Sequence, residues 1–222
     1  MSVEPSPAVN PDPWEDAYLR FETPAEEIRK FEARLLDLGA RSWSRDAEIV
    51  DLFCGRANGL RALANLGFRR LEGVDLSPRL VAEYVGPAKL HLADCRALPF
   101  ADASKDLALV QGGLHHLPEL PGDLERTLDE VDRVLRPGGR FAIVEPWLTP
   151  FLRVVHAVAD QPAARRFWRK LDALQTMIDH ERRTYEQWLA QPASILALLE
   201  RRFVVERRVV GWGKLQFVGR KR

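Results

Sequence analysis

Short apolar runs alternate with helical stretches through the first two thirds of this chain, and this alternation constrains the fold more than any other feature. Each run is short and apolar enough for a buried strand, and the stretches between them space their apolar residues as a helix does. The predicted strands are residues 47–52, 70–75, 88–93, 106–111 and 140–145, and the predicted helices between them are residues 57–67, 78–84 and 120–135. Strands joined through helices need right-handed crossovers, so we predict an α/β fold with a parallel sheet covered on both faces.

A further helix is predicted ahead of the first strand. Thr23 and Glu26 form a capping box, with Pro24 at the first helical position. Apolar residues then recur at helical spacing as far as Gly39, a residue type that commonly ends a helix in a left-handed conformation. We therefore predict a helix over residues 24–38.

The pattern changes after the fifth predicted strand. Residues 147–190 are helical in pattern and rich in large aromatic rings, and residues 192–201 predict one more helix. Two β-rich runs around a turn at 211–213 then predict an antiparallel hairpin. We expect residues 1–22 to be a tail, residues 23–222 to be the folded domain, and the helical segment after the fifth strand to be a lid.

Composition bears on where the protein is located. The chain has 222 residues, and its apolar runs are far shorter than the roughly 20 residues that a membrane-spanning helix needs. Its proline- and serine-rich start lacks the features of a secretory signal. Only two cysteines occur, Cys54 and Cys95, so we expect no disulfide framework, and a reducing compartment is favoured. We therefore expect a cytoplasmic protein.

Charge is divided unevenly along the chain. The net charge is +1, but residues 151–222 hold 15 basic and 7 acidic side chains. A basic C-terminal third can face nucleic acid, an anionic substrate or an anionic membrane. The solvated face of an amphipathic helix explains the same residues more simply.

Acidic residues and a glycine cluster where the predicted strands end. Asp51, Asp75 and Asp94 end the first three strands, and Gly55 follows the first. Ligands of open α/β sheets bind outside these carboxyl ends, where three carboxylates need hydrogen-bond donors or a cation. Asp75 lies 20 residues beyond Gly55, the spacing at which an acid meets both hydroxyls of a ribose. The sequence therefore predicts a ligand with a ribose, several donors and a positive charge.

Four stretches of the chain resemble the motifs of the class I S-adenosylmethionine-dependent methyltransferases. They are IVDLFCGRANGL at 49–60, LEGVDLSP at 71–78, LADCRALPFADASKDLALVQGGLHHL at 92–117 and LRPGGRFAIVEP at 135–146. Together they follow the order and spacing of that family, and they are similar to its small-molecule branch, which includes quinone and sterol enzymes. The resemblance implies a Rossmann-like, seven-stranded, mostly parallel sheet with a C-terminal antiparallel hairpin, in which the LRPGG run is the turn before the fifth strand.

The loop after the first strand is where this chain departs from the family. The resemblance implies that Asp51 and the backbone of Phe53, Cys54 and Gly55 hold the methionine amino group of S-adenosylmethionine. The usual D-x-G-x-G-x-G motif has glycine where this chain has Phe53 and Ala57. The methyl group of Ala57 is tolerated at a negative φ and disfavoured at a positive one.

The other strand ends carry the remaining donor contacts that the resemblance implies. Asp75, with Leu76 next to it, would accept hydrogen bonds from the ribose hydroxyls. Asp94 would accept from the adenine amino group beside the backbone of Cys95. Gln111 would lie against the methionyl part and the methyl-bearing sulfur.

Two histidines and a glutamate are the candidates for acid–base work on the methyl acceptor. His115 and His116 follow the fourth strand, Glu145 ends the fifth, and Tyr185 is a weaker candidate. Methyl transfer neutralises a sulfonium, so a side-chain base need not exist. Packing of the histidines and capping of the next helix by Glu145 are the alternatives. Because adjacent histidines project in different directions and no cysteine or third histidine lies nearby, we expect no metal site.

The sequence thus predicts an enzyme that transfers a methyl group from S-adenosylmethionine to a small molecule. A nicotinamide dehydrogenase needs G-x-G-x-x-G, whereas the glycine pattern here is G-x-A-x-G after an acid. The chain also lacks the Pro-Cys and Asn/Asp-Pro-Pro-aromatic motifs of enzymes that methylate pyrimidine C5 or the exocyclic amines of bases. We therefore do not expect nucleic acid as a partner, although these two absences leave ribose and guanine targets open. The alternative is an RNA-directed or non-catalytic protein of this fold that binds an anionic partner through its basic C-terminal third.

Overall fold

The centre of the molecule is a seven-stranded sheet. The computed structural model describes residues 17–18 and 20–222 and orders the strands β3-β2-β1-β4-β5-β7-β6. The strands are β1 (Glu48–Leu52), β2 (Arg70–Asp75), β3 (Lys89–Leu92), β4 (Lys105–Gln111), β5 (Leu135–Pro146), β6 (Phe203–Gly211) and β7 (Lys214–Lys221). The strands from β3 to β5 pair in parallel, and β7 pairs antiparallel to both β5 and β6. The predicted parallel sheet and terminal hairpin are therefore confirmed.

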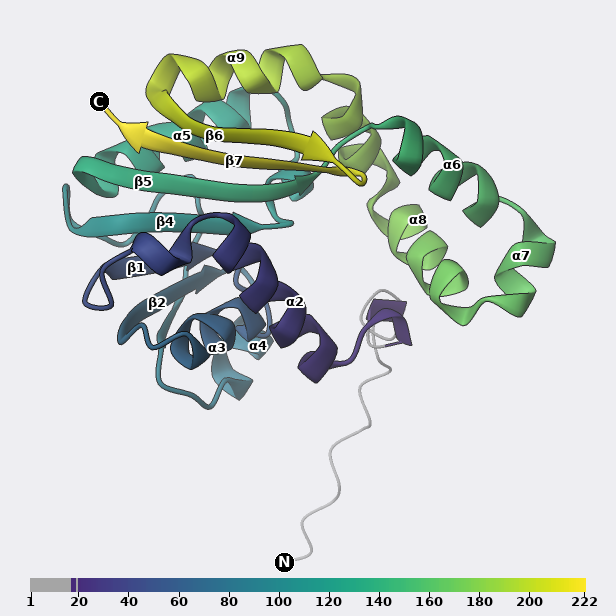
Figure 1. The fold of residues 1–222 in the computed structure, drawn as a ribbon, viewed down its shortest axis with the longest axis horizontal. Helices are drawn as coiled ribbons and strands as arrows, with labels where there is room; N and C mark the ends of the chain where they lie inside the picture. Colours follow the sequence, from purple (N-terminus) through teal and green to yellow (C-terminus); the bar gives the residue numbers. More distant parts are fainter. Residues whose placement is uncertain (1–16, 19) are drawn as a thin grey trace, which may run out of the picture.

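Helices cover both faces of this sheet (Figure 1). One face carries α2 (Pro24–Asp37), α3 (Asn58–Asn65) and α4 (Pro78–Glu83), and the other carries α5 (Gly122–Val134) and α9 (Pro192–Arg202). Two short 3₁₀ turns, η1 (Ala40–Ser42) and η2 (Leu114–His116), complete these layers. α2 has the predicted capping box of Thr23 and Glu26, and Gly39 follows its end with a φ of 104°.

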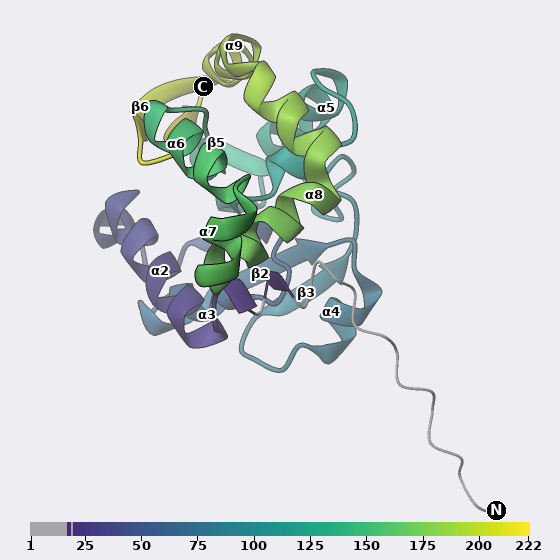
Figure 2. The same cartoon turned by 90° about the vertical axis from the view of Figure 1, so that its right-hand side faces the viewer.

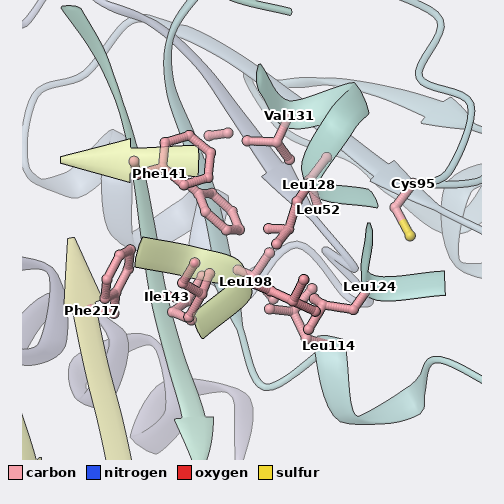
Figure 3. Close-up of a cluster of buried hydrophobic side chains, with 14 of the residues drawn as sticks. Leu52, Cys95, Leu114, Leu124, Leu128, Val131, Phe141, Ile143, Leu198 and Phe217 are labelled. Carbon is pink, nitrogen blue, oxygen red and sulfur yellow. The ribbon is translucent and has the colours of Figure 1, made fainter. Parts of the chain in front are cut away.

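Each face of the sheet has its own hydrophobic core. One core packs α5 and α9 against the sheet and contains Leu52, Phe141 and Phe217 (Figure 3). The other packs α2 and α3 against the opposite face and contains Leu35 and Leu109. Strands covered on both faces are apolar along their whole length, which is why β1, β4 and β5 were recognisable as continuous apolar runs.

The helical insert, defined here as residues 150–190, stands beyond the carboxyl ends of the strands (Figures 1 and 2). It consists of α6 (Pro150–Ala159), α7 (Pro162–Phe167) and α8 (Arg169–Ala190). Trp188 near the end of α8 is fully buried, and its indole Nε1 donates a hydrogen bond to the Pro146 carbonyl at 2.8 Å. The insert therefore covers the edge of the sheet at which a ligand is expected.

Two predicted turns differ from those of the structure. The run at 135–139 belongs to β5 and is not a turn, because Leu135 pairs with Lys105 before the register of the two strands shifts. Gly138 has a φ of 78°, which lets the strand bend at this irregularity. The hairpin turn is only Trp212-Gly213, with φ of 51° and 76°, as a two-residue hairpin of this hand requires.

Two further predictions concern the location of the chain. In the part of the chain that the structure describes, no helix combines the length and the apolar character needed to cross a membrane. Cys54 and Cys95 are both buried and free, as expected for a chain without a disulfide framework. Most of the tail predicted at residues 1–22 lies outside the described residues.

Candidate functional site

A cavity of about 830 Å³ opens at the carboxyl ends of the parallel strands, beside the helical insert. Figure 2 shows this side of the molecule, with α7 and α8 in front of the strand ends. The predicted site residues that line it are Asp51, Phe53, Cys54, Gly55, Asp75, Gln111, His115, His116 and Glu145. Leu76, Asp94 and Cys95 are not among its lining residues. The sheet thus brings most of the predicted site together.

The Asp51 carboxylate is buried, and the described residues give it no partner. Asp51 is 4% exposed, and no described residue gives its side chain a hydrogen bond or a cation. Burial and the neighbouring charge of Asp75 raise the pKa of Asp51 to about 8. Gly59 leaves room for this carboxylate, because a Cβ there would lie 2.5 Å from Asp51 Oδ2. A cationic group in the cavity would supply the missing partner.

Asp75 shapes the ligand-facing loop from the neighbouring strand. Its Oδ2 accepts from the Gly55 amide at 2.7 Å, and its Oδ1 accepts from the Ser77 amide at 2.9 Å. Gly55 has a φ of 50°, and a Cβ added to it would meet no atom within 4 Å. The space in front of the Gly55 backbone is therefore open to a ligand.

Gln111 is the orphan polar group of the cavity. It ends β4, and its side-chain Nε2 and Oε1 are both buried without a hydrogen-bond partner among the described residues. A buried amide without partners costs about 1–3 kcal/mol. Gln111 lacks hydrogen-bond partners, Asp51 lacks a cation, and the backbone at Gly55 is open. These three features fit a ligand that has a positive charge, a hydrogen-bond donor and a hydrogen-bond acceptor.

The loop between β1 and α3 contains two left-handed residues that are not glycine. Phe53 has a φ of 57° and Ala57 a φ of 60°, at the two positions where the family motif has glycine. The Phe53 ring lies so close to Gly113 that a Cβ there would be 2.4 Å from its Cγ, and Ala57 is fully buried in the core under α2. The loop therefore keeps a glycine-like shape, at a cost of about 1–2 kcal/mol per residue that packing offsets.

Glu145 holds η2 against the sheet. Its Oε1 accepts from the amides of Gly113 at 2.8 Å and Leu114 at 2.9 Å, and its Oε2 lies 2.8 Å from His115 Nδ1. The alternative role as a helix cap is wrong, because Thr149 caps α6 instead. Glu145 is only 1% exposed, and it lines the cavity beside His115, whose ring it positions.

His115 and His116 point to the same side, contrary to the prediction for adjacent histidines. Their ring centroids lie 4.2 Å apart, with the ring planes inclined by 34°. Both rings turn toward Glu181 on α8, whose Oε2 lies 3.6 Å from His115 Nε2 and 3.6 Å from His116 Nδ1. One ligand atom of each residue lies within 4.8 Å of the other two, so the three can share a proton or a cation, and the expected absence of a metal stays a prediction.

The two imidazoles differ in charge at neutral pH. Burial by itself would lower the pKa of His115, but Glu145 and Glu181 outweigh it and raise that pKa to about 9. Burial, together with the charge of His115, lowers the pKa of His116 to about 4. The pair therefore presents one protonated and one neutral ring.

Asp94 and its neighbours lie apart from the cavity. The Asp94 carboxylate accepts from Arg96 Nη2 at 2.6 Å, and Arg96 Nη1 also pairs with Asp123 at 2.9 Å. Cys95 is buried 3.6 Å from the Thr127 hydroxyl, and burial raises the pKa of its thiol to about 12. The contacts of Asp94 and Cys95 with an adenine ring stay predictions.

Sequence reasoning missed several charged residues that line the cavity, among them Glu181, Arg34 and Lys214. These three come from α8, α2 and β7, and no motif marks them. The one available signal was the four-residue spacing of Glu181 and Tyr185, which places both on one side of a helix. Tyr185 also lines the cavity, and its hydroxyl lies 3.1 Å from His156 Nε2.

The part of the chain that contains the parallel strands is similar in sequence to known methyltransferases. Residues 50–143 match a family model described as a methyltransferase domain. The ubiquinone/menaquinone biosynthesis C-methyltransferase UbiE of Rubrivivax gelatinosus is 36% identical over 114 residues, which cover 46% of this chain and 43% of that enzyme. The match thus spans less than half the length of this curated relative.

Solved structures show the same fold over most of the chain. The PH0226 protein of Pyrococcus horikoshii superposes with a TM-score of 0.68 at 18% identity, covering 95% of this chain and 99% of that one. The N-methyltransferase NodS of Bradyrhizobium japonicum, in complex with S-adenosyl-L-homocysteine, superposes with a TM-score of 0.60 at 18% identity, covering 96% and 93%. The fold is therefore the Rossmann-like fold of these proteins.

We predict that Ala57→Val lowers the free energy of unfolding by more than about 2 kcal/mol, because a β-branched residue is strained at a positive φ and overfills the core. Ala57→Gly is the matched variant. Relief of about 1–2 kcal/mol of left-handed strain offsets a lost methyl of about 0.8 kcal/mol and the greater chain freedom of glycine, so its stability changes by less than about 1 kcal/mol. Urea denaturation measures both variants. A valine variant as stable as the parent would contradict the left-handed loop.

We also predict that the stabilisation provided by His115 depends on pH. Its pKa is near 6.5 in the unfolded chain and about 9 in the folded protein, so this stabilisation is complete below pH 6.5 and disappears as the pH rises through 9. The difference in unfolding free energy between the parent and His115→Asn should therefore shrink over that interval. Urea midpoints at four pH values test this, with His180→Asn, an exposed residue of α8, as the control. A difference that is constant with pH would rule out the raised pKa.

Proposed function

We propose that this chain, which belongs to the class I S-adenosylmethionine-dependent methyltransferases, transfers the sulfonium methyl group of that donor to a small organic acceptor. The observation that carries the proposal is the buried Asp51 carboxylate, which lacks a cation next to an orphan Gln111 amide. Curated relatives that act on small molecules, named as a sterol 4-C-methyltransferase of Caenorhabditis elegans and a quinone-pathway enzyme, support the acceptor class.

The donor would be held along three neighbouring strands. Asp51 and Gln111, with the open backbone at Gly55, would take its amino-acid end, and Asp75 would take the ribose hydroxyls. When bound, S-adenosylmethionine supplies a methyl group on a positively charged sulfur, which makes that carbon electrophilic. The contribution of the chain is to hold the two reactants in line in a dry site.

His115, His116, Glu145 and Glu181 form a cluster that would bind the acceptor and the proton that it loses. Glu145 positions His115, which keeps its proton at neutral pH and can donate a hydrogen bond into the cavity. The neutral His116 and Glu181 can accept a hydrogen bond from an acceptor hydroxyl or amine. With its pKa lowered to about 4, His116 is a weak base that takes only a proton that methylation has already made acidic. Acceptors that are already nucleophilic need no such base, so the cluster widens the range of chemistry without being required for it.

The helical insert would exclude water from the reaction, as the predicted lid. It lines the cavity with apolar side chains, which are Phe151, Leu152, Val155, Leu174, Met177 and Ile178. Water-free surroundings strengthen the interactions between the chain and a charged donor. A cytoplasmic location also stays our prediction, based on the two free, buried cysteines.

The RNA-directed alternative is the weaker proposal. Some basic residues of the C-terminal third form ion pairs with acidic residues of α5. Arg201 pairs with Glu125 at 3.0 Å, and Arg202 pairs with Asp129 at 2.5 Å. The basic excess of that third of the chain is therefore partly neutralised within the fold, which leaves less of it for phosphate groups.

We predict that binding of S-adenosylhomocysteine at pH 7 releases close to one proton. Asp51 is mostly protonated there, because its pKa is about 8, and the ammonium group of the ligand favours the carboxylate. Calorimetric titration in two buffers with different ionisation enthalpies counts the protons. Asp51→Asn should bind the ligand without releasing one. A parent protein that releases none would show that Asp51 does not face the ammonium group.

Asp75→Ala should abolish binding of S-adenosylhomocysteine, because it removes the predicted acceptor for the ribose hydroxyls and frees the Gly55 amide. The chain should stay folded, as circular dichroism would show. Asp102→Ala is the matched control, since Asp102 is an exposed acid that pairs with Arg133 at 2.8 Å and does not line the cavity. Unchanged affinity in calorimetric titration of Asp75→Ala would contradict the proposed donor site.

A further inference from the structure

Three cationic side chains line the end of the cavity that lies beyond the expected donor site. Lys30 and Arg34 are four residues apart and share one side of α2. Lys214 begins β7, where it pairs with Pro146 at the carboxyl end of β5. Because side chains alternate along a strand, Lys214 lies on the same sheet face as Val218, which is the face that α2 covers. The three cations therefore come from two elements packed against one another.

Two of these three cations form no ion pair with a described residue, although Glu22 and Glu27 line the same cavity. Lys30 pairs with Glu22, but neither Arg34 nor Lys214 has a hydrogen bond or an ion pair with any described residue. Burial, followed by the charges of Arg34 and Lys30, lowers the pKa of Lys214 to about 8, and burial also lowers the pKa of Arg34. Half-buried charges of the same sign are costly unless a counter-charge joins them. Glu22 and Glu27 offset part of the charge, because both lie near Lys30 and act on Arg34. Three cations against two carboxylates still leave one positive charge, which an anion would neutralise.

The strand order shows which reactant would reach this end. The donor contacts occupy the ends of β2, β1 and β4, and the sheet continues through β5 to β7. Neighbouring strands are about 4.8 Å apart, so the backbone of Lys214 lies on the order of 10 Å from the end of β4. His115, held by Glu145 of β5, lines the same cavity. A molecule with its reactive atom beside the donor could thus reach the cations with its far end.

We propose that the methyl acceptor is an apolar molecule with one anionic group, such as a carboxylate, which Arg34 and Lys214 bind at the β7 end of the cavity. This inference rests on the proposed methyl transfer, because it assumes that the donor occupies the ends of β2, β1 and β4 and leaves the rest of the cavity to the acceptor. The apolar side chains of the insert contact the body of the acceptor. The anionic group lies about 5–10 Å from the methylated atom, which is one to two strand spacings.

The test uses two probes of equal size that differ in charge. Calorimetry measures the affinities of 2-naphthoate and its neutral analogue 2-naphthamide for the protein saturated with S-adenosylhomocysteine. The parent should bind the carboxylate at least ten-fold more tightly than the amide. Lys214→Met and Arg34→Met should each reduce that ratio below three-fold and leave the affinity for the amide unchanged. Lys214→Arg should keep the ratio, and Lys89→Met, at an exposed lysine outside the cavity, is the control.

Several outcomes would overturn the inference. Equal affinity of the parent for the two probes, no binding of either, or an unchanged ratio in both methionine variants would each do so. A ten-fold loss of affinity for S-adenosylhomocysteine in the methionine variants, with the probe ratio unchanged, would assign the cations to the carboxylate of the donor. If S-adenosylhomocysteine does not bind the parent, the methyl-transfer proposal fails. A charge preference measured without it would then still support the anion site.

Discussion

The parallel alignment of β2, β1, β4 and β5 is the constraint on which the candidate site depends. Parallel strands end at the same edge, so Asp75, Asp51, Gln111 and Glu145 gather there from four neighbouring strands. Asp51 pairs in register with Gly73 and Leu109, so it lies two residues short of the ends of β2 and β4. Three carboxylates this close repel one another. Each is accommodated differently: Asp75 by two backbone amides, Glu145 by His115 and two amides, and Asp51 by a raised pKa. The one acid that lacks a built-in partner is thus the one left for a ligand.

The fold and the strand-end residues of the cavity were predictable because their signals are local. Strand and helix periods, the capping box at Thr23 and the strand-end acids are all contained within short windows of sequence. The positions of Arg34, Glu181 and Lys214 in the cavity were not predictable, because α2, α8 and β7 are far apart in the sequence and supply these residues to one cavity only in the folded chain. The common direction of the two histidines likewise depends on Glu181, which lies 65 residues further along the chain than His116.

Glycine was a poor guide to backbone conformation at two places in this chain. The glycines after Leu135 indicated a turn, whereas they bend a strand at a register shift. Phe53 and Ala57 lack the freedom of glycine, yet they adopt the left-handed backbone that the family motif achieves with glycine. The surrounding contacts impose the conformation there: the Cys54 amide donates to Val74, Ala57 donates to Cys54 at 2.7 Å, and the Phe53 ring packs against Gly113. Loop shape in this fold is therefore set by the neighbouring strand as much as by the residues of the loop.

The tip of the terminal hairpin fastens the start of the helical insert to the sheet. The Gly213 carbonyl accepts from the Trp147 amide at 2.8 Å, and the Gly213 amide donates to Thr149 Oγ1 at 3.1 Å. Since Trp188 fastens the other end of the insert to Pro146, both of its ends are tied to one strand end. A hinge at either attachment would break these hydrogen bonds, whereas bending near residues 160–168, between α6 and α8, would break none of them. At this far end, the contacts described for the start of α8 include two ion pairs between side chains, Lys170 with Glu26 at 3.6 Å and Asp172 with Arg20 at 3.3 Å. A movement of the insert would therefore exchange these two ion pairs for solvent and leave both attachments intact.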